Sequence, residues 1–166
     1  MLRINFRKPV TVTGVNNYTV SPDGKDPKKE ELGNFFTMVD YFGNSLFLKG
    51  ANGYVANETK AGQDMFAWYQ ISEIKIDLTG LSANGLTFTV EGAPAGTGDN
   101  AEVYTVAPAT TGGVLGVDVL NDVKIVCDYK TNILENPVTV KVPVTVTYYW
   151  GTQKVEATVT VKPFKK

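Results

Sequence analysis

Few side chains in this sequence could do covalent or acid–base chemistry. The chain has 166 residues with one cysteine, Cys127, and no histidine. It therefore has no Ser–His or Cys–His pair, no imidazole metal ligand and no side chain that ordinarily titrates near neutral pH. Cys127 alternates in phase with Val123 and Ile125, a pattern that favours a buried structural thiol over a reactive one. We therefore expect a protein that is not an enzyme.

Two acidic pairs and one glycine-rich segment are candidate ligand sites. Asp99 with Glu102, and Asp118 with Asp122, could bind Ca²⁺ at loop ends, but neither has the dense oxygen spacing of a calcium loop. Residues 92–100 resemble a phosphate-binding loop only in glycine content, because the Gly-Lys-Ser/Thr signature is missing. Solvated loops are the favoured interpretation, and we expect no metal and no cofactor.

Four aromatic residues could form a platform on which a sugar ring stacks, since aromatic faces bind apolar sugar faces. They are Trp68, Tyr69, Tyr149 and Trp150. The tip of a predicted hairpin would expose Trp150. Packing of Trp150 onto its own hairpin is the alternative interpretation.

The last 30 residues carry the clearest structural pattern. Valine and threonine alternate over residues 138–149 and again over 155–162, on either side of a predicted turn at 150–153. Strict alternation of β-branched residues predicts an antiparallel hairpin. Pro143 falls inside the first strand, where we expect a bulge or an edge position, because proline cannot donate a ladder hydrogen bond.

Five further short strands are predicted upstream of this hairpin. They cover residues 71–78 (with a bulge, or a start at Glu73), 86–90, 103–107, 115–119 and 123–129. Seven short strands within residues 70–166 match the ~100-residue size of an immunoglobulin-like sandwich.

The segment VTVTYYWGTQKVEATVTVKP resembles the last hairpin of bacterial and phage immunoglobulin-like domains. The resemblance covers residues 70–166 and implies an all-β fold, an immunoglobulin-like antiparallel β-sandwich. It departs from antibody-type domains in lacking a cysteine pair. The resemblance is to modules of tailed-bacteriophage capsid auxiliary or decoration proteins and of bacterial surface proteins, with crAss-like phages as one source that it suggests.

Residues 1–69 are expected to form a β-rich N-terminal extension to the sandwich domain. Strands are predicted at 3–6 and 10–15, an exposed loop at 21–31 and one helical turn at 28–32. An aromatic-rich stretch follows and runs to Tyr69. These aromatics either bind a partner or complete the core of one larger β domain.

Charge is distributed unevenly along the chain. Net charge is +2 over residues 1–63, −7 over 64–135 and +4 over 136–166. This pattern argues against a nucleic-acid groove, which needs one continuous basic face. It suits self-association or docking of the termini, although ordinary surface charge explains it equally well. We also expect no membrane span and no secretory signal.

Taken together, these features predict a non-enzymatic structural protein of a bacteriophage virion, located on the capsid surface. The expected partners are capsid or other virion proteins. The expected contact residues are Phe35, Phe36, Tyr41, Phe42 and Phe47, supplemented by Arg3, Arg7, Lys8, Lys165 and Lys166. The alternative is a carbohydrate- or protein-binding module of a bacterial surface protein, with Trp150 in its platform.

Overall fold

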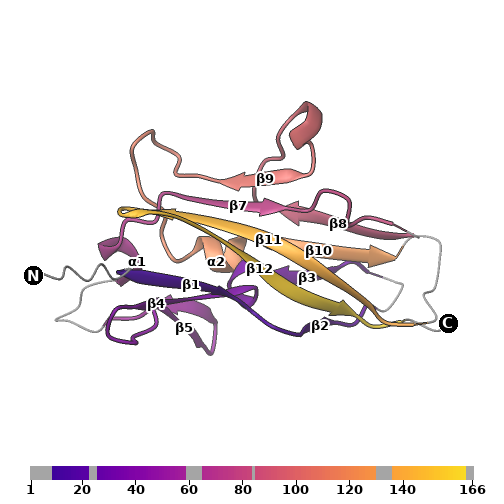
Figure 1. The fold of residues 1–166 in the computed structure, drawn as a ribbon, viewed down its shortest axis with the longest axis horizontal. Coiled ribbons are helices and arrows are strands. Elements are labelled where there is room, and N and C mark those ends of the chain that lie inside the picture. The colour runs from indigo at the N-terminus through magenta and orange to yellow at the C-terminus, as the bar shows by residue number, and fades with distance from the viewer. Residues whose placement is uncertain (1–8, 23–25, 59–64, 84, 130–135, 164–166) are drawn as a thin grey trace, which may run out of the picture.

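The computed structural model describes residues 9–22, 26–58, 65–83, 85–129 and 136–163. Strands account for 51% of these residues and helical turns for 10%, which confirms the all-β class. The longest strands form a hairpin that runs along much of the molecule (Figure 1).

The strands are β1 (Val10–Gly14), β2 (Tyr18–Val20), β3 (Lys28–Glu31), β4 (Phe36–Asp40), β5 (Phe47–Gly50), β6 (Gly53–Ala56), β7 (Glu73–Asp77), β8 (Leu86–Glu91), β9 (Val103–Val106), β10 (Lys124–Tyr129), β11 (Val138–Tyr148) and β12 (Gly151–Val161). The short helices are α1 (Met65–Trp68), α2 (Val119–Asp122) and the 3₁₀ turns η1 (Leu32–Asn34) and η2 (Gly98–Asn100).

Two larger sheets organise these strands. One has five strands in the order β2-β12-β11-β7-β9, and the other has three in the order β3-β10-β8. Two antiparallel pairs, β1 with β4 and β5 with β6, complete the described strands. Pairing within the larger sheets is antiparallel except where β2 joins β12 in parallel.

The predicted C-terminal hairpin is confirmed. Val144 and Val146 of β11 and Val159 of β12 are buried, while the intervening threonines lie on the outer face. This is the side-chain alternation of a strand with one buried face. The turn comes earlier than predicted, because Tyr148 pairs with Gly151 and leaves a two-residue loop at 149–150.

Pro143 occupies an edge position without a bulge. It lies opposite Glu156 in an uninterrupted register between β11 and β12. Pairing of β11 with β7 begins one residue later, at Val144. The missing N–H of Pro143 therefore interrupts no pairing on the β7 side, which explains why proline is accepted in a strand with two neighbours.

Two predicted elements are wrong. Residues 28–32 were predicted as a helical turn, but Lys28–Glu31 form β3, because they pair with β10; the helical turn begins at Leu32. Residues 115–119 were predicted as a strand, but the chain there leads into α2, with the Leu115 N–H bonded to the Ile71 carbonyl. The other predicted strands upstream of the hairpin are confirmed within one or two residues: 10–15, the strand from Glu73, 86–90, 103–107 and 123–129. The strand predicted at 3–6 lies outside the described residues.

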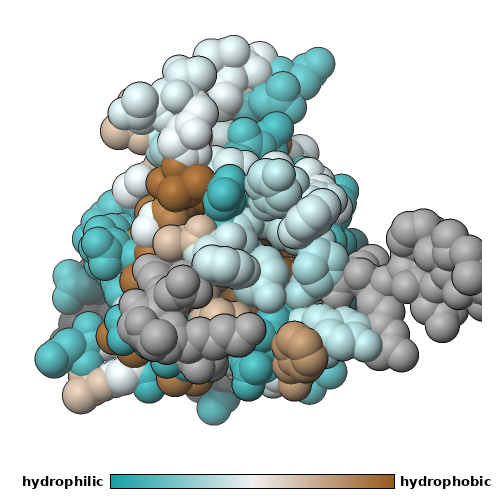
Figure 2. Space-filling view, turned by 90° about the vertical axis from the view of Figure 1, so that its left-hand side faces the viewer, coloured by the Kyte–Doolittle hydropathy of each residue, from teal (hydrophilic) through white to brown (hydrophobic). Residues whose placement is uncertain are grey.

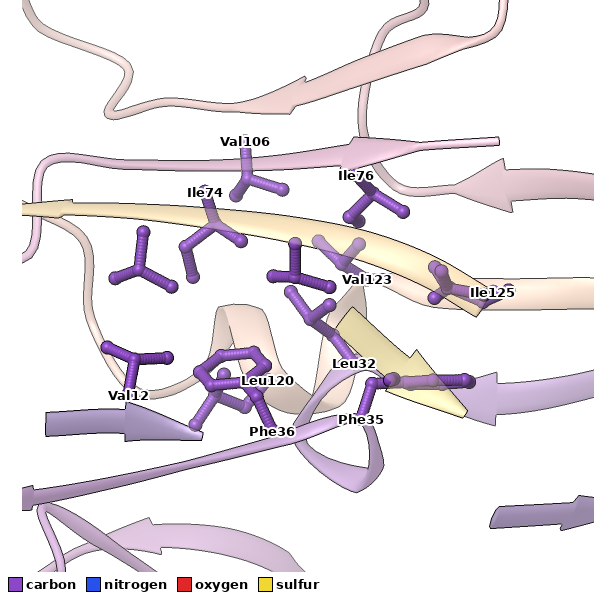
Figure 3. Close-up of a cluster of buried hydrophobic side chains, with 14 of the residues drawn as sticks. Val12, Leu32, Phe35, Phe36, Ile74, Ile76, Val106, Leu120, Val123 and Ile125 are labelled. Atoms are coloured by element: carbon purple, nitrogen blue, oxygen red, sulfur yellow. The ribbon is translucent and has the colours of Figure 1, made fainter. Parts of the chain in front are cut away.

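Residues before and after position 69 share one hydrophobic core. Strand β2 belongs to the five-stranded sheet and β3 to the three-stranded sheet. Phe35 and Phe36 are almost fully buried and lie in the same cluster as Ile74 and Ile125 (Figure 3). A boundary at residue 69 therefore does not divide this core, and the buried aromatic residues on the N-terminal side of it complete the core.

Candidate binding surface

Five large aromatic side chains are exposed at one end of the molecule, and we call this surface the aromatic end. It comprises Tyr41, Phe42, Trp68, Tyr149 and Trp150. Phe42 is 77% exposed and Trp150 68% exposed. Such exposure costs favourable burial, so clustered aromatics on a surface are a feature of binding sites.

A tight turn after β4 presents the first pair of rings. The buried Asp40 carboxylate accepts hydrogen bonds from the backbone N–H groups of Phe42 (2.9 Å) and Asn44 (2.8 Å). These bonds fix the turn, as aspartate does in Asx turns. Tyr41 and Phe42 then meet edge to face, with ring centroids 5.2 Å apart and planes at 84°.

The tip of the β11–β12 hairpin presents the second pair. Tyr149 and Trp150 form its two-residue loop and also meet edge to face, with centroids 4.8 Å apart. The Tyr149 N–H donates to the Tyr69 carbonyl at 3.1 Å. This bond ties the hairpin tip to the residue after α1, whose Trp68 is 60% exposed.

Hydrogen bonds of Gln153 hold these parts at the same end. Asp40, which begins the first turn, pairs with Val10 at the start of β1. Gln153 of β12 donates to the Val10 carbonyl at 2.6 Å and accepts from the Val12 N–H at 3.1 Å. The hairpin tip, α1 and the start of β1 accordingly lie together at the left of Figure 1. Figure 2 faces this end, where apolar side chains are interspersed with polar ones.

An open groove of about 420 Å³ lies next to the hairpin tip. Its walls include Ser72, Glu73 and Thr147 together with the loop of residues 107–113. Thr147 is opposite Glu73 in the sheet register and two residues before Tyr149. The lining therefore offers hydroxyl groups and one carboxylate beside exposed aromatic rings, a combination that the sequence did not indicate.

Three of the predicted contact residues are misplaced. Phe35, Phe36 and Phe47 are only 1%, 0% and 8% exposed, so they cannot reach a partner, and their prediction as contact residues is wrong. The reason is packing: the rings of Phe36 and Phe47, for example, meet edge to face at 5.8 Å inside the core.

The other predicted contact residues remain candidates or lie outside the description. Tyr41, Phe42 and Trp150 are on the aromatic end, where Trp68 and Tyr149 of the predicted sugar platform join them. Tyr69 is partly buried against the core and is not part of the exposed surface. Arg3, Arg7, Lys8, Lys165 and Lys166 lie outside the described residues.

Two of the groups considered for catalysis or metal binding, Cys127 and Glu102, are engaged in other ways. Burial, followed by the charges of Asp128 and Glu30, raises the pKa of Cys127 to about 12, so the thiol keeps its proton at neutral pH. Glu102 accepts a hydrogen bond from the Gly80 N–H at 3.1 Å. Within the described parts of the chain, no group of three or more His, Cys, Asp or Glu residues could hold a metal ion.

Comparison with known proteins finds no matching family model, no matching curated protein and no matching solved structure. Over the described ranges, no helix is both long and apolar enough to cross a membrane. The fold and surface define an all-β protein whose exposed aromatic residues gather at one end.

Proposed function

We propose that this chain is a non-enzymatic structural protein of a bacteriophage virion, which attaches to the capsid surface through its aromatic end. The observation that carries the proposal is the presentation of Tyr41, Phe42, Trp68, Tyr149 and Trp150 by three separate segments fixed by backbone hydrogen bonds. Pre-organised aromatic residues are typical anchors of protein interfaces, because little conformational entropy is lost when they bind.

The charge of the sequence suits attachment to an acidic partner. Arg3, Arg7 and Lys8 precede β1 in the sequence. Basic groups steer a protein toward an acidic partner surface. Residues 64–135 carry a net charge of −7, so a second copy of the chain could also supply the acidic partner surface.

We also propose that the fold is immunoglobulin-like. The orders β7-β11-β12 and β3-β10-β8 correspond to the CFG and BED strand groups of immunoglobulin sheets, and β2 lies parallel to the last strand. The strand β9, which follows β8 and returns to pair with β7, departs from that scheme. Modules of this kind serve as surface decoration on phage capsids, according to the resemblance of the C-terminal hairpin.

Co-sedimentation with capsids of the phage whose genome carries this gene tests the proposal. The double variant Phe42→Ser/Trp150→Ser should weaken capsid binding by at least about 30-fold, which is the effect of losing about 2 kcal/mol from a single aromatic anchor. Both side chains are exposed, so the variant should keep the stability of the wild type.

A matched control removes exposed apolar groups elsewhere. Leu48 and Val55 face each other across the β5–β6 pair and are about as exposed as Tyr41. The variant Leu48→Ser/Val55→Ser should bind capsids as the wild type does. The proposal fails if the aromatic variant binds normally, or if the gene is not part of a phage genome.

The groove favours a second candidate function, a carbohydrate-binding module of a bacterial surface protein. Indole and phenol rings beside hydroxyl and carboxylate groups can stack on a sugar ring and hydrogen-bond its hydroxyls. A glycan array probed with the wild type and with Trp150→Ala separates the two candidates. Glycan binding that Trp150→Ala abolishes would favour this function, and an array without any signal would remove it.

A further inference from the structure

A cluster of polar side chains away from the aromatic end surrounds the side-chain amide of Asn34, the last residue of η1. The Asn34 Oδ1 atom accepts hydrogen bonds from the Tyr54 hydroxyl and from Lys49 Nζ, the latter at 3.2 Å. Lys49 also lies over the Tyr54 ring, with Nζ 5.3 Å from the ring centroid. The lysine amine is therefore held next to the amide carbonyl by two contacts.

The amide nitrogen of Asn34 has its own partners. Nδ2 donates to the Tyr18 hydroxyl at 3.0 Å, and that hydroxyl donates to Glu30 Oε2 at 2.5 Å. A tyrosine and a carboxylate are thus connected to the nitrogen that would leave if the amide were attacked. The adjacent Glu31 has a buried Oε2 atom for which no partner is found.

We propose that Lys49 and Asn34 form an intramolecular isopeptide bond. Neutral Lys49 Nζ attacks Asn34 Cγ, the Nζ–Cγ bond forms, the Cγ–Nδ2 bond breaks, and one proton of the amine leaves with Nδ2 as ammonia. No oxidant, cofactor or second substrate takes part. The inference is independent of the proposed function, because it concerns residues outside the aromatic end.

The neighbouring groups suit this reaction. Tyr54 points a hydroxyl donor at the carbonyl oxygen, where negative charge develops during attack. The Tyr18 hydroxyl accepts a hydrogen bond from Nδ2 and donates one to Glu30, and these two bonds hold the amide in its orientation. Holding amine and amide in contact replaces an encounter between separate molecules, which accounts for a large share of such rate enhancements.

Protonation decides how fast the bond forms. An ammonium group is not a nucleophile whereas a neutral amine is, so the rate of bond formation should rise with pH. The titratable groups that face the site are Tyr18, Tyr54, Glu30 and Glu31. Burial and the charge of Glu31 raise the pKa of Tyr54, and burial and Glu30 raise that of Tyr18, so both hydroxyls keep their protons in mildly alkaline solution.

Intact-mass spectrometry of the purified full chain tests the proposal. Incubation at about pH 9.5, where amines are partly neutral, should produce a species about 17 Da lighter through loss of ammonia. A tryptic digest of that species should contain one branched peptide that joins the segments around Asn34 and Lys49. Lys49→Arg should keep the full mass, while retaining a cation beside Asn34.

The controls separate this bond from other losses of ammonia. Succinimide formation at Asn52-Gly53 or Asn84-Gly85 gives the same mass change, but it would persist in Lys49→Arg and yield no branched peptide. Lys75→Arg changes a half-exposed lysine elsewhere in the fold and should react like the wild type. An unchanged wild-type mass after incubation, or an equal loss in Lys49→Arg, would overturn the proposal.

Discussion

At the residue scale, burial decides what the potentially reactive and adhesive side chains can do. Cys127 is the one thiol of the chain and is 1% exposed, on the buried face of β10. Phe36 is fully buried, whereas Phe42, six residues later, is 77% exposed. Residue type alone therefore does not tell whether a phenylalanine is buried or exposed. For Cys127, the alternation of its strand correctly predicted burial.

Alkylation kinetics of Cys127 test its burial. At pH 8 the folded protein should react with iodoacetamide at least about 100-fold more slowly than the urea-unfolded chain, because only an accessible thiolate is nucleophilic. Mass spectrometry gives the alkylated fraction without ambiguity, since the chain has no second thiol. Equal rates in the two states would show that the side chain is accessible.

The raised pKa of Cys127 also predicts how stability changes with pH. The unfolded chain releases the thiol proton near the ordinary pKa of 9.0, whereas the folded protein retains it up to about pH 12. The contribution of this group to stability is therefore complete below pH 9 and is lost as the pH rises toward 12. The free energy of unfolding should fall less steeply over this range in Cys127→Ala than in the wild type, and parallel curves would contradict the prediction.

At the element scale, short segments are held in place by side chains that replace backbone partners. Asn121 in α2 accepts from the Tyr54 N–H at 2.6 Å and donates to the Tyr54 carbonyl at 2.9 Å. Asn121 thereby ties α2 to β6. The hydroxyl of Tyr54, on the same strand, donates to Asn34 Oδ1. Gly53 is required beside Asn121, because its φ is +110° and a Cβ there would lie 2.4 Å from Asn121 Oδ1.

Removal of this amide should destabilise the protein. Asn121→Ala leaves both backbone groups of Tyr54 without these partners, and we expect the free energy of unfolding to fall by about 2–4 kcal/mol, since each unpaired polar group costs about 1–3 kcal/mol. Urea denaturation monitored by fluorescence measures the change. Asn100→Ala, at an exposed asparagine, should change stability by less than about 0.5 kcal/mol. Equal stability of both variants would refute this role of Asn121.

At the scale of the whole molecule, segments distant in sequence complete each other. Strand β1 lies so close to β12 that a Cβ on Gly14 would be 2.0 Å from the Glu156 carbonyl oxygen. Strands β2 and β3 form edges of the two larger sheets. Both sheets therefore depend on strands that come from the first 69 residues of the chain.

Deletion of residues 1–69 tests this dependence. A fragment of residues 70–166 loses β2, β3 and the buried Phe35, Phe36 and Phe66, so we expect it to remain unfolded. Circular dichroism and amide proton dispersion in NMR spectra compare the fragment with the full chain. A cooperative thermal transition of the fragment would show instead that residues 70–166 form a domain by themselves.

Local patterns explain which elements could be predicted. The alternation in β11 and β12 lies within one hairpin and needs no distant contact to be recognised. The Lys-Lys-Glu-Glu segment of β3 has the composition of a helix surface, and only pairing with β10, nearly 100 residues away, makes it a strand. Residues 115–119 show the alternation of a strand without a neighbouring strand to pair with, and there the chain enters α2 instead.

The sequence by itself determined the all-β class, the C-terminal hairpin and the buried cysteine, because alternation and composition act over a few neighbouring residues. Only the tertiary structure decided which aromatics are core and which form the aromatic end. That division depends on long-range pairing, such as β1 with β4 and Gln153 with Val10, which brings Phe42, Trp68 and Trp150 to one end. The contact of Lys49 with Asn34 arises in the same way, since side chains from η1, β2, β5 and β6 meet there only after the chain folds.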